Sequence, residues 1–212
     1  DEAVADALRD RMATADLDEA VATVDEPIDR SEATVFRGES RIGNFVADAY
    51  RWAMDADIGL QNSGGIRSGE PLREQVTLAD LISLVPFEER VAVARLSGEE
   101  LLDVFRQADG SRVDFGESDW WHAHVSGARI VWDRDSRELV DATVEGEPID
   151  PDATYTVATT RYLFHSDHEF AAIDESHLVE SGPIQYEALA NYARETGIDP
   201  SIEGRIVRDG GE

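Results

Sequence analysis

The sequence of 212 residues contains no cysteine, no lysine and no long apolar run. Without cysteine, disulfide bonds and thiolate metal sites are excluded. Nothing approaches the roughly 18 consecutive apolar residues of a membrane-spanning helix, so no segment is expected to cross a membrane. A secretion signal is also lacking and the chain begins with Asp1. We therefore expect a processed form or a piece of a longer protein.

Positive charge is scarce as well. The 19 basic residues are all arginine and face 46 acidic ones, which gives a formal net charge of -27. Such a charge repels phosphates, so nucleic acid and anionic membrane are not expected as partners. A hydrophobic content of 42% with clear apolar periodicity nevertheless predicts a folded chain. At molar salt the Debye length is about 3 Å, so we expect adaptation to a salt-rich environment and stability that rises with salt.

Apolar periodicity predicts both helices and strands, in mixed order along the chain. This order is typical of an α/β fold of the α+β type, with a mixed β-sheet and helices packed on it. The expected helices cover residues 42–56, 77–84, 97–108 and 184–196. The expected strands cover residues 33–36, 56–60, 91–96, 120–125, 128–133, 139–144, 155–160 and 204–207.

The first residues are interpreted separately from the domain. Residues 1–28 are expected to be a connecting element from an upstream domain, with a helix over 1–14 and a short strand near 21–24. The domain itself is expected to span residues 29–212.

A glycine-rich turn follows the strand expected at 56–60. Its sequence is Gln61-Asn62-Ser63-Gly64-Gly65-Ile66-Arg67. Glycine reaches backbone angles closed to other residues and lets a ligand approach the main chain. Asn62 offers an amide, and Arg67 offers a planar cationic fork suited to phosphate or carboxylate. The turn is either an oxyanion-binding loop or an ordinary strand end with a surface arginine.

Two other segments carry residues suited to the same ligand. Arg37 and Arg41 precede or open the helix expected at 42–56, where they could converge with Arg67 on one phosphate. The alternative is that they pair with the many surface carboxylates. Phe87 follows Pro86 on a turn, where an aromatic ring either stacks on a flat base or fills the core.

A polar loop leaves the strand expected at 155–160. It contains Tyr162, a second aromatic, followed by His165, Asp167 and His168. Imidazole and carboxylate suit zinc or manganese, so this loop could also be a metal site. No HExxH spacing supports that alternative. His122 and His124 lie on one face of an expected strand without further ligands near them in the sequence.

Other catalytic classes lack their motifs. The sequence has no GxSxG elbow, P-loop, GxGxxG motif or cysteine nucleophile, and no nucleophile, base and electrophile can be assembled from it. Four segments instead resemble, in order and spacing, the C-terminal domain of the 5′-nucleotidase and UDP-sugar hydrolase family. They are Ile42-Gly43-Asn44-Phe45-Val46-Ala47-Asp48-Ala49, Asn62-Ser63-Gly64-Gly65-Ile66-Arg67, Val85-Pro86-Phe87 and residues 155–170.

The resemblance implies a nucleotide-binding domain, with catalysis elsewhere. In that family a separate N-terminal metallophosphoesterase domain holds two divalent metal ions and the catalytic histidine. The implied substrate-binding residues are Arg37, Arg41, Asn62, Gly64, Gly65, Arg67, Phe87, Tyr162, Asp167 and His168, with no catalytic residue and no metal ligand in this chain. Arg67 would contact the phosphate, joined by Arg37 in preference to Arg41. Phe87 and Tyr162 would clamp the base.

One segment departs from the family pattern. The usual Gly-Gly-Asp-Gly-Phe is replaced here by Ser166-Asp167-His168-Glu169-Phe170. The aspartate expected to bind the ribose hydroxyls aligns with His168, and Asp167 stands beside it. Recognition of the ribose, and with it the preferred substrate, is therefore open. A non-catalytic nucleotide- or anion-binding module and the metal-binding loop are the alternative functions, and the family suggests an extracellular or cell-surface location.

Overall fold

A computed structural model describes residues 17–113, 116–117 and 119–210. The helix expected over 1–14 lies outside the described residues. The helices are α2 (Glu32–Phe36), α3 (Arg41–Met54), α4 (Leu78–Leu84), α5 (Gly98–Arg106) and α6 (Gln185–Thr196). The strands are β1 (Ala20–Ile28), β2 (Ile58–Asn62), β3 (Leu72–Thr77), β4 (Arg90–Ser97), β5 (Ala123–Ser126), β6 (Ala128–Asp133), β7 (Glu138–Val144), β8 (Glu147–Pro148), β9 (Thr154–Thr160), β10 (Leu178–Ile184) and β11 (Ile206–Asp209).

A five-stranded mixed sheet is the centre of the molecule. Its order is β10-β4-β9-β2-β5. β2 runs parallel to β9, and the other neighbours are antiparallel. β2 and β9 therefore end at the same edge of the sheet, where β4, antiparallel to β9, begins. The mixed sheet with packed helices confirms the predicted fold class.

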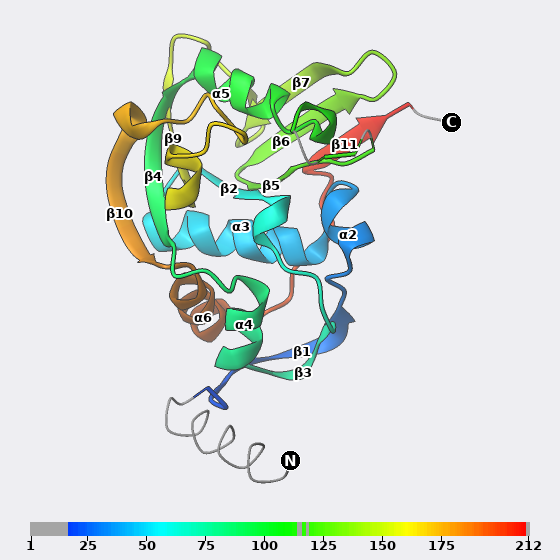
Figure 1. The fold of residues 1–212 in the computed structure, drawn as a ribbon, viewed down its shortest axis with the longest axis vertical. Helices are drawn as coiled ribbons and strands as arrows, with labels where there is room; N and C mark the ends of the chain where they lie inside the picture. The colour runs from blue at the N-terminus through cyan, green and yellow to red at the C-terminus, as the bar shows by residue number, and fades with distance from the viewer. Residues whose placement is uncertain (1–16, 114–115, 118, 211–212) are drawn as a thin grey trace.

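Two smaller sheets flank the central one. A four-stranded sheet has the order β11-β6-β7-β8, and β1 pairs with β3 in a two-stranded ribbon. Figure 1 shows α3, α4 and α6 on the side of the central sheet that faces this ribbon, and α5 with the four-stranded sheet on the other side. Among the described residues, no helix is long and apolar enough to span a bilayer.

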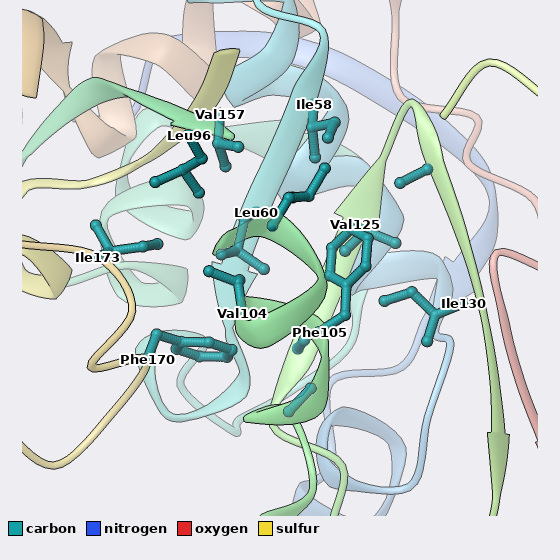
Figure 2. Packing of buried hydrophobic residues seen from close by; sticks show 14 of the residues in the cluster. Ile58, Leu60, Leu96, Val104, Phe105, Val125, Ile130, Val157, Phe170 and Ile173 are labelled. Atoms are coloured by element: carbon teal, nitrogen blue, oxygen red, sulfur yellow. The ribbon is translucent and has the colours of Figure 1, made fainter. Parts of the chain in front are cut away.

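Each face of the central sheet packs against its own apolar core, because alternate residues of a strand point to opposite faces. On the α5 side, Leu60, Val104 and Phe105 meet between β2 and α5 (Figure 2). On the other side, Val91 of β4 joins side chains from α3, α4 and α6. β9 contributes Val157 to the first core and Ala158 to the second, so this strand is packed on both of its faces.

The helix starts follow from local capping. Ser40 caps α3 by accepting a hydrogen bond from the amide of Gly43, and Thr77 with Asp80 forms a capping box on α4. The prediction of a strand over residues 33–36 is wrong. Ser31 accepts a hydrogen bond from the amide of Thr34 at 3.3 Å, and this cap starts the short helix α2 there.

Several strands are absent from the sequence-based expectations. β3 and β10 are irregularly paired, and each contains three consecutive exposed residues, so neither shows the alternation of a half-buried strand. β1 is longer than the strand expected near residues 21–24 and buries Val21, Val24 and Ile28 in the core shared with α3. Residues 20–28, assigned from the sequence to the connection, thus pack with the rest of the domain.

Candidate functional site

A cavity of about 430 Å³ opens at the sheet edge where β2 and β9 end and β4 begins. This volume lies in the range usual for small-molecule sites. Ten residues line it: Asn62, Gly64, Gly65, Arg67, Phe87, Glu89, Thr160, Tyr162, Glu169 and Gln185. Six of them are predicted from the sequence as substrate-binding residues. They belong to the glycine-rich turn and the two aromatic positions. The structure brings these six together from three separate segments.

The turn at Asn62 is rigid and continues the sheet. Every residue of β2 is buried, up to and including Asn62. Beyond it, the amides of Ser63, Ile66 and Arg67 donate to the carbonyls of His122, Ser63 and Leu84 at 3.2, 3.1 and 2.9 Å. These three amides already donate hydrogen bonds within the fold. They are therefore not available to bind an anion in the oxyanion-binding loop expected from the turn. The side chains of Asn62 and Arg67 remain as the polar groups that it presents.

The two glycines of the turn have different reasons for being glycine. Neither has a positive φ, so access to special backbone angles explains neither. A Cβ on Gly65 would lie 2.0 Å from the Gln61 amide nitrogen and 2.8 Å from the Asn62 side-chain oxygen. A Cβ on Gly64 would find no atom closer than 3.5 Å, at the ring of His122. Close packing against Gln61 and Asn62 thus requires glycine at position 65 alone.

Arg67 and Phe87 meet because both are tied to the end of α4. The Arg67 amide donates to the carbonyl of Leu84, and the Phe87 amide donates to that of Val85 at 2.8 Å. The exposed Arg67 guanidinium lies over the Phe87 ring, 4.9 Å from its centroid. A cation and an aromatic face are thus presented side by side at the mouth of the cavity.

Tyr162 supplies the second ring of the cavity. It follows β9 in the short helical turn Arg161–Phe164 and is 41% exposed. Its hydroxyl donates to Glu169 Oε1 at 2.9 Å. Partial burial raises the pKa of Tyr162, and the neighbouring Glu169 carboxylate contributes to the shift. Tyr162 therefore stays neutral and anchored at its hydroxyl, while its ring faces the cavity.

Glu169 is a buried carboxylate in the cavity wall that the sequence does not nominate. It is 5% exposed and accepts from Tyr162 at Oε1, from Asn62 Nδ2 at 2.8 Å and from His122 Nε2 at 2.5 Å. Burial alone would raise the pKa of Glu169, but the bonds from His122, Tyr162 and Asn62 outweigh it and hold the pKa below its usual value. Glu169 is thus ionised at neutral pH and holds two predicted ligand contacts in place.

Two buried histidines support this wall. The His122 ring lies between Phe36 and Phe170, with centroids 6.2 and 5.8 Å away. Because a carboxylate only accepts, His122 Nε2 carries the proton shared with Glu169. Burial lowers the pKa of His124 to about 4, against a bond to the Val35 carbonyl that acts in the opposite direction. His124 is therefore neutral at pH 7.

The His124 ring also explains the glycine of the family-like motif in α3. A Cβ on Gly43 would lie 2.0 Å from His124 Nδ1. Glycine at this position lets α3 approach β5, the strand that carries His124.

Comparison with known proteins places this geometry in a family. The model of the 5′-nucleotidase C-terminal domain matches residues 20–175, more than half of the chain. The chain belongs to the 5′-nucleotidase C-terminal domain family. This match confirms the resemblance drawn from the motifs, and it includes the whole cavity wall except Gln185.

Relatives of this family are much longer than the chain. It is 31% identical over 191 residues to an apyrase of Tabanus yao, covering 79% of this chain and 34% of the apyrase. It is 24% identical over 166 residues to protein UshA of Escherichia coli, covering 77% of this chain and 29% of that protein. The chain thus spans about a third of the length of each of these two relatives.

A solved structure shows the same fold. The 5′-nucleotidase precursor from Thermus thermophilus superposes with a TM-score of 0.82 at 24% identity, over 95% of this chain and 42% of that one.

Four residues implied by the family do not line the cavity. Arg41 donates from Nε to the Pro200 carbonyl at 2.7 Å and does not line the cavity with Arg67, so its contact with the phosphate stays a prediction. Arg37 is exposed, just beyond α2. Asp167 and His168 are exposed and pair with each other at 3.1 Å. The chain turns so that Glu169, the next residue, points into the cavity in their place.

The alternative metal site in this loop does not assemble. His165 Nε2 lies 3.0 Å from Glu175 Oε1, away from the pair formed by Asp167 and His168. Within the described part of the chain, no group of three or more His, Cys, Asp or Glu side chains is placed to hold a metal ion.

The remaining wall residues come from the sheet topology, which the sequence does not reveal. Val91 pairs with Thr160, and Ile184 pairs with Arg90. Glu89, Thr160 and Gln185 therefore gather where β4, β9 and β10 meet. A signal for Glu89 and Thr160 does exist, since each stands two residues from a predicted aromatic clamp residue.

Proposed function

We propose that this chain is the nucleotide-binding domain of a metal-dependent 5′-nucleotidase-like phosphohydrolase. The single observation that carries the proposal is that Asn62, Arg67, Phe87 and Tyr162 line one cavity. A nucleotide needs a flat apolar slot for its base and a cation for its phosphate, and these side chains supply both. Membership of the family supports the same reading.

Each residue has a proposed role. The base lies between Phe87 and Tyr162, and each stacking face contributes about 1–3 kcal/mol. Arg67 holds the phosphate and orients the ester, and the Asn62 amide contacts the nucleoside. Arg37 stays a proposed phosphate contact that its exposed side chain could make only by turning toward the cavity.

Hydrolysis is assigned to an N-terminal metallophosphoesterase domain in the same polypeptide, with two divalent metal ions. The donor sets of the described residues do not fit such a pair of ions. What this chain does is therefore to bind and orient the substrate. Alone, it should bind nucleotide without cleaving it.

The first prediction tests the aromatic clamp. Replacing Phe87 with alanine should weaken the binding of a nucleoside monophosphate by about tenfold or more, because one stacking face is lost. Isothermal titration calorimetry on the purified chain measures the change. Trp52→Ala is the matched control, since Trp52 is 45% exposed on α3 and outside the cavity. Equal affinity of the Phe87 variant and the parent would contradict the clamp, and steady phosphate release by the clean chain with divalent metal would contradict the division of labour.

We also propose that the protein works in a salt-rich medium outside the cytoplasm. The support is the net charge of -27, carried with no lysine, together with the family resemblance. Self-repulsion of this size weakens the compact state until salt screens it.

The second prediction follows from that charge. The melting temperature should rise as potassium chloride increases from about 0.1 to about 3 M, with most of the rise at the lower concentrations where screening changes fastest. Differential scanning fluorimetry gives the curve. Sucrose at matched water activity is the control, because it stabilises by exclusion without screening charge. A melting temperature that is flat or falls with salt would refute the adaptation.

A further inference from the structure

Three polar residues of the cavity lining have no part in the proposed roles. Thr160 ends β9, Glu89 precedes β4 and Gln185 opens α6, and strand pairing brings the three together. The Gln185 amide also donates to the Glu89 carbonyl at 3.0 Å, which fixes their two backbones side by side. Phe87 and Tyr162 stand two residues from Glu89 and Thr160 in the sequence, so this wall borders the slot between the two rings.

The side chains of Gln185 and Thr160 each have a hydrogen-bonding group that the described part of the fold does not use. The Tyr50 hydroxyl donates to Gln185 Oε1 at 2.5 Å, which leaves the Gln185 Nε2 group as the donor. Thr160 is only 3% exposed, and its hydroxyl bonds to no other group of the described residues. A buried polar group without a partner is costly, so an unpaired one in a cavity wall indicates a ligand contact.

Glu89 completes the pattern with a carboxylate. In the described part of the chain, this carboxylate takes part in no hydrogen bond or ion pair. Arg161 interacts electrostatically with Glu89, but its guanidinium donates its hydrogen bond to Glu175 at 2.9 Å. Arg90 is likewise directed to the Gly182 carbonyl at 2.8 Å. The wall therefore offers an acceptor at Glu89, a donor at Gln185 and a hydroxyl that does either.

We propose that Glu89, Thr160 and Gln185 read the hydrogen-bonding edge of the base, and that guanine is the base they match most fully. This inference rests on the proposed nucleotide-binding function. Guanine presents two adjacent donors, N1–H and the 2-amino group, which one carboxylate accepts together, and its O6 accepts from Gln185. Adenine, cytosine and uracil each present a single donor position beside an acceptor. The bidentate contact with Glu89 is thus available to guanine alone.

The third prediction ranks five nucleotides on the intact chain by calorimetry. The wild-type chain should bind the guanine monophosphate about tenfold more tightly than the adenine, cytosine and uracil ones. The hypoxanthine monophosphate, which lacks the 2-amino group, should lie between. Glu89→Gln should remove most of the advantage of guanine, because an amide cannot accept both donors. Thr160→Val should weaken all five.

Two matched control variants distinguish a loss of base recognition from a general loss of structure. Glu88→Gln removes an exposed neighbouring charge outside the cavity, and Thr159→Val removes a buried hydroxyl that does not line it. Both should keep the ranking of the wild type. Thermal melting of every variant checks that it folds, and the wild-type ranking is informative without any variant.

The outcomes distinguish the two proposals. If no nucleotide binds to the wild-type chain, the proposed function fails and this inference fails with it. If nucleotides bind in a Phe87-dependent way but with equal affinity for all bases, the function stands and the base-reading wall is refuted. A guanine preference that survives Glu89→Gln would also refute it.

Discussion

Replacing Glu169 with alanine is expected to destabilise the fold by about 3 kcal/mol and to weaken nucleotide binding about tenfold. The carboxylate accepts from His122, Asn62 and Tyr162 inside the cavity wall, so its removal leaves buried donors without an acceptor. Asn62 and Tyr162 then lose the contact that aims them at the ligand. Urea denaturation and calorimetry measure the two effects.

Glu169→Gln separates charge from geometry. Its amide oxygen can still accept from His122 and Asn62, and the Tyr162 hydroxyl can turn to accept from its nitrogen. This variant should therefore keep most of the stability. Because the pKa of Glu169 is held below its usual 4.5 in the fold, ionised Glu169 stabilises the protein above that pH and the contribution is lost as pH falls below it. The glutamine variant should lack this part of the acid sensitivity.

Asp167→Ala is the control, two residues away on the exposed side of the same loop. It should leave stability and binding unchanged. Equal behaviour of Glu169→Ala and Asp167→Ala would show that the buried carboxylate holds nothing in place.

Replacing Gly65 with alanine should cost about 2–3 kcal/mol of stability and abolish tight nucleotide binding. The new methyl group would overlap the Gln61 amide, which is fully buried and donates to the Asn62 carbonyl and side-chain oxygen at 2.7 and 2.8 Å. Gln61 cannot withdraw without breaking both bonds and shifting Asn62. Denaturation and calorimetry again give the two numbers.

Gly64→Ala is the neighbouring comparison. Its methyl group would meet only ordinary contacts, and its backbone angles suit any residue. Stability within about 0.5 kcal/mol of the parent is expected. If both alanine variants were equally harmful, close packing at Gly65 would not be what the motif requires.

The elements that could be predicted from sequence are those whose signals are local. α4 and α5 begin at capping boxes, and β4 carries a continuous apolar run, so their positions follow from short windows. β3 and β10 could not be predicted in this way, because their burial does not alternate and they are held by distant partners, β1 and β4. The strand predicted over residues 33–36 was wrong. Its β-branched and aromatic residues favour a strand, but the Ser31 cap starts a helix there.

The residues of the candidate site could likewise be predicted only where their sequence signal is local. Asn62, Arg67, Phe87 and Tyr162 belong to motifs with recognisable spacing, and the fold brings them into one cavity. Glu169 was missed since it stands where the family has glycine, and only the turn of the loop directs it inward. Glu89 and Gln185 depend on the sheet order, which single-sequence patterns do not contain.

Arg41 is a predicted contact that the structure places outside the cavity lining. The family resemblance implies it as the weaker of two arginine contacts to the phosphate, and its side chain donates to the carbonyl of Pro200, a residue far along the chain. A long arginine side chain reaches partners over several ångströms, so its direction follows from tertiary neighbours that the local sequence does not name.

The cavity joins a buried side to an exposed side. Asn62 sits at the end of a strand buried throughout, whereas Arg67, five residues on, is exposed and lays its charged end over the ring of Phe87. Binding would therefore immobilise Arg67 at an entropic cost of about 0.5–1.5 kcal/mol, while Asn62 has already been ordered by folding. The ordering cost of binding therefore falls on the exposed side of the cavity, and the buried side adds little to it.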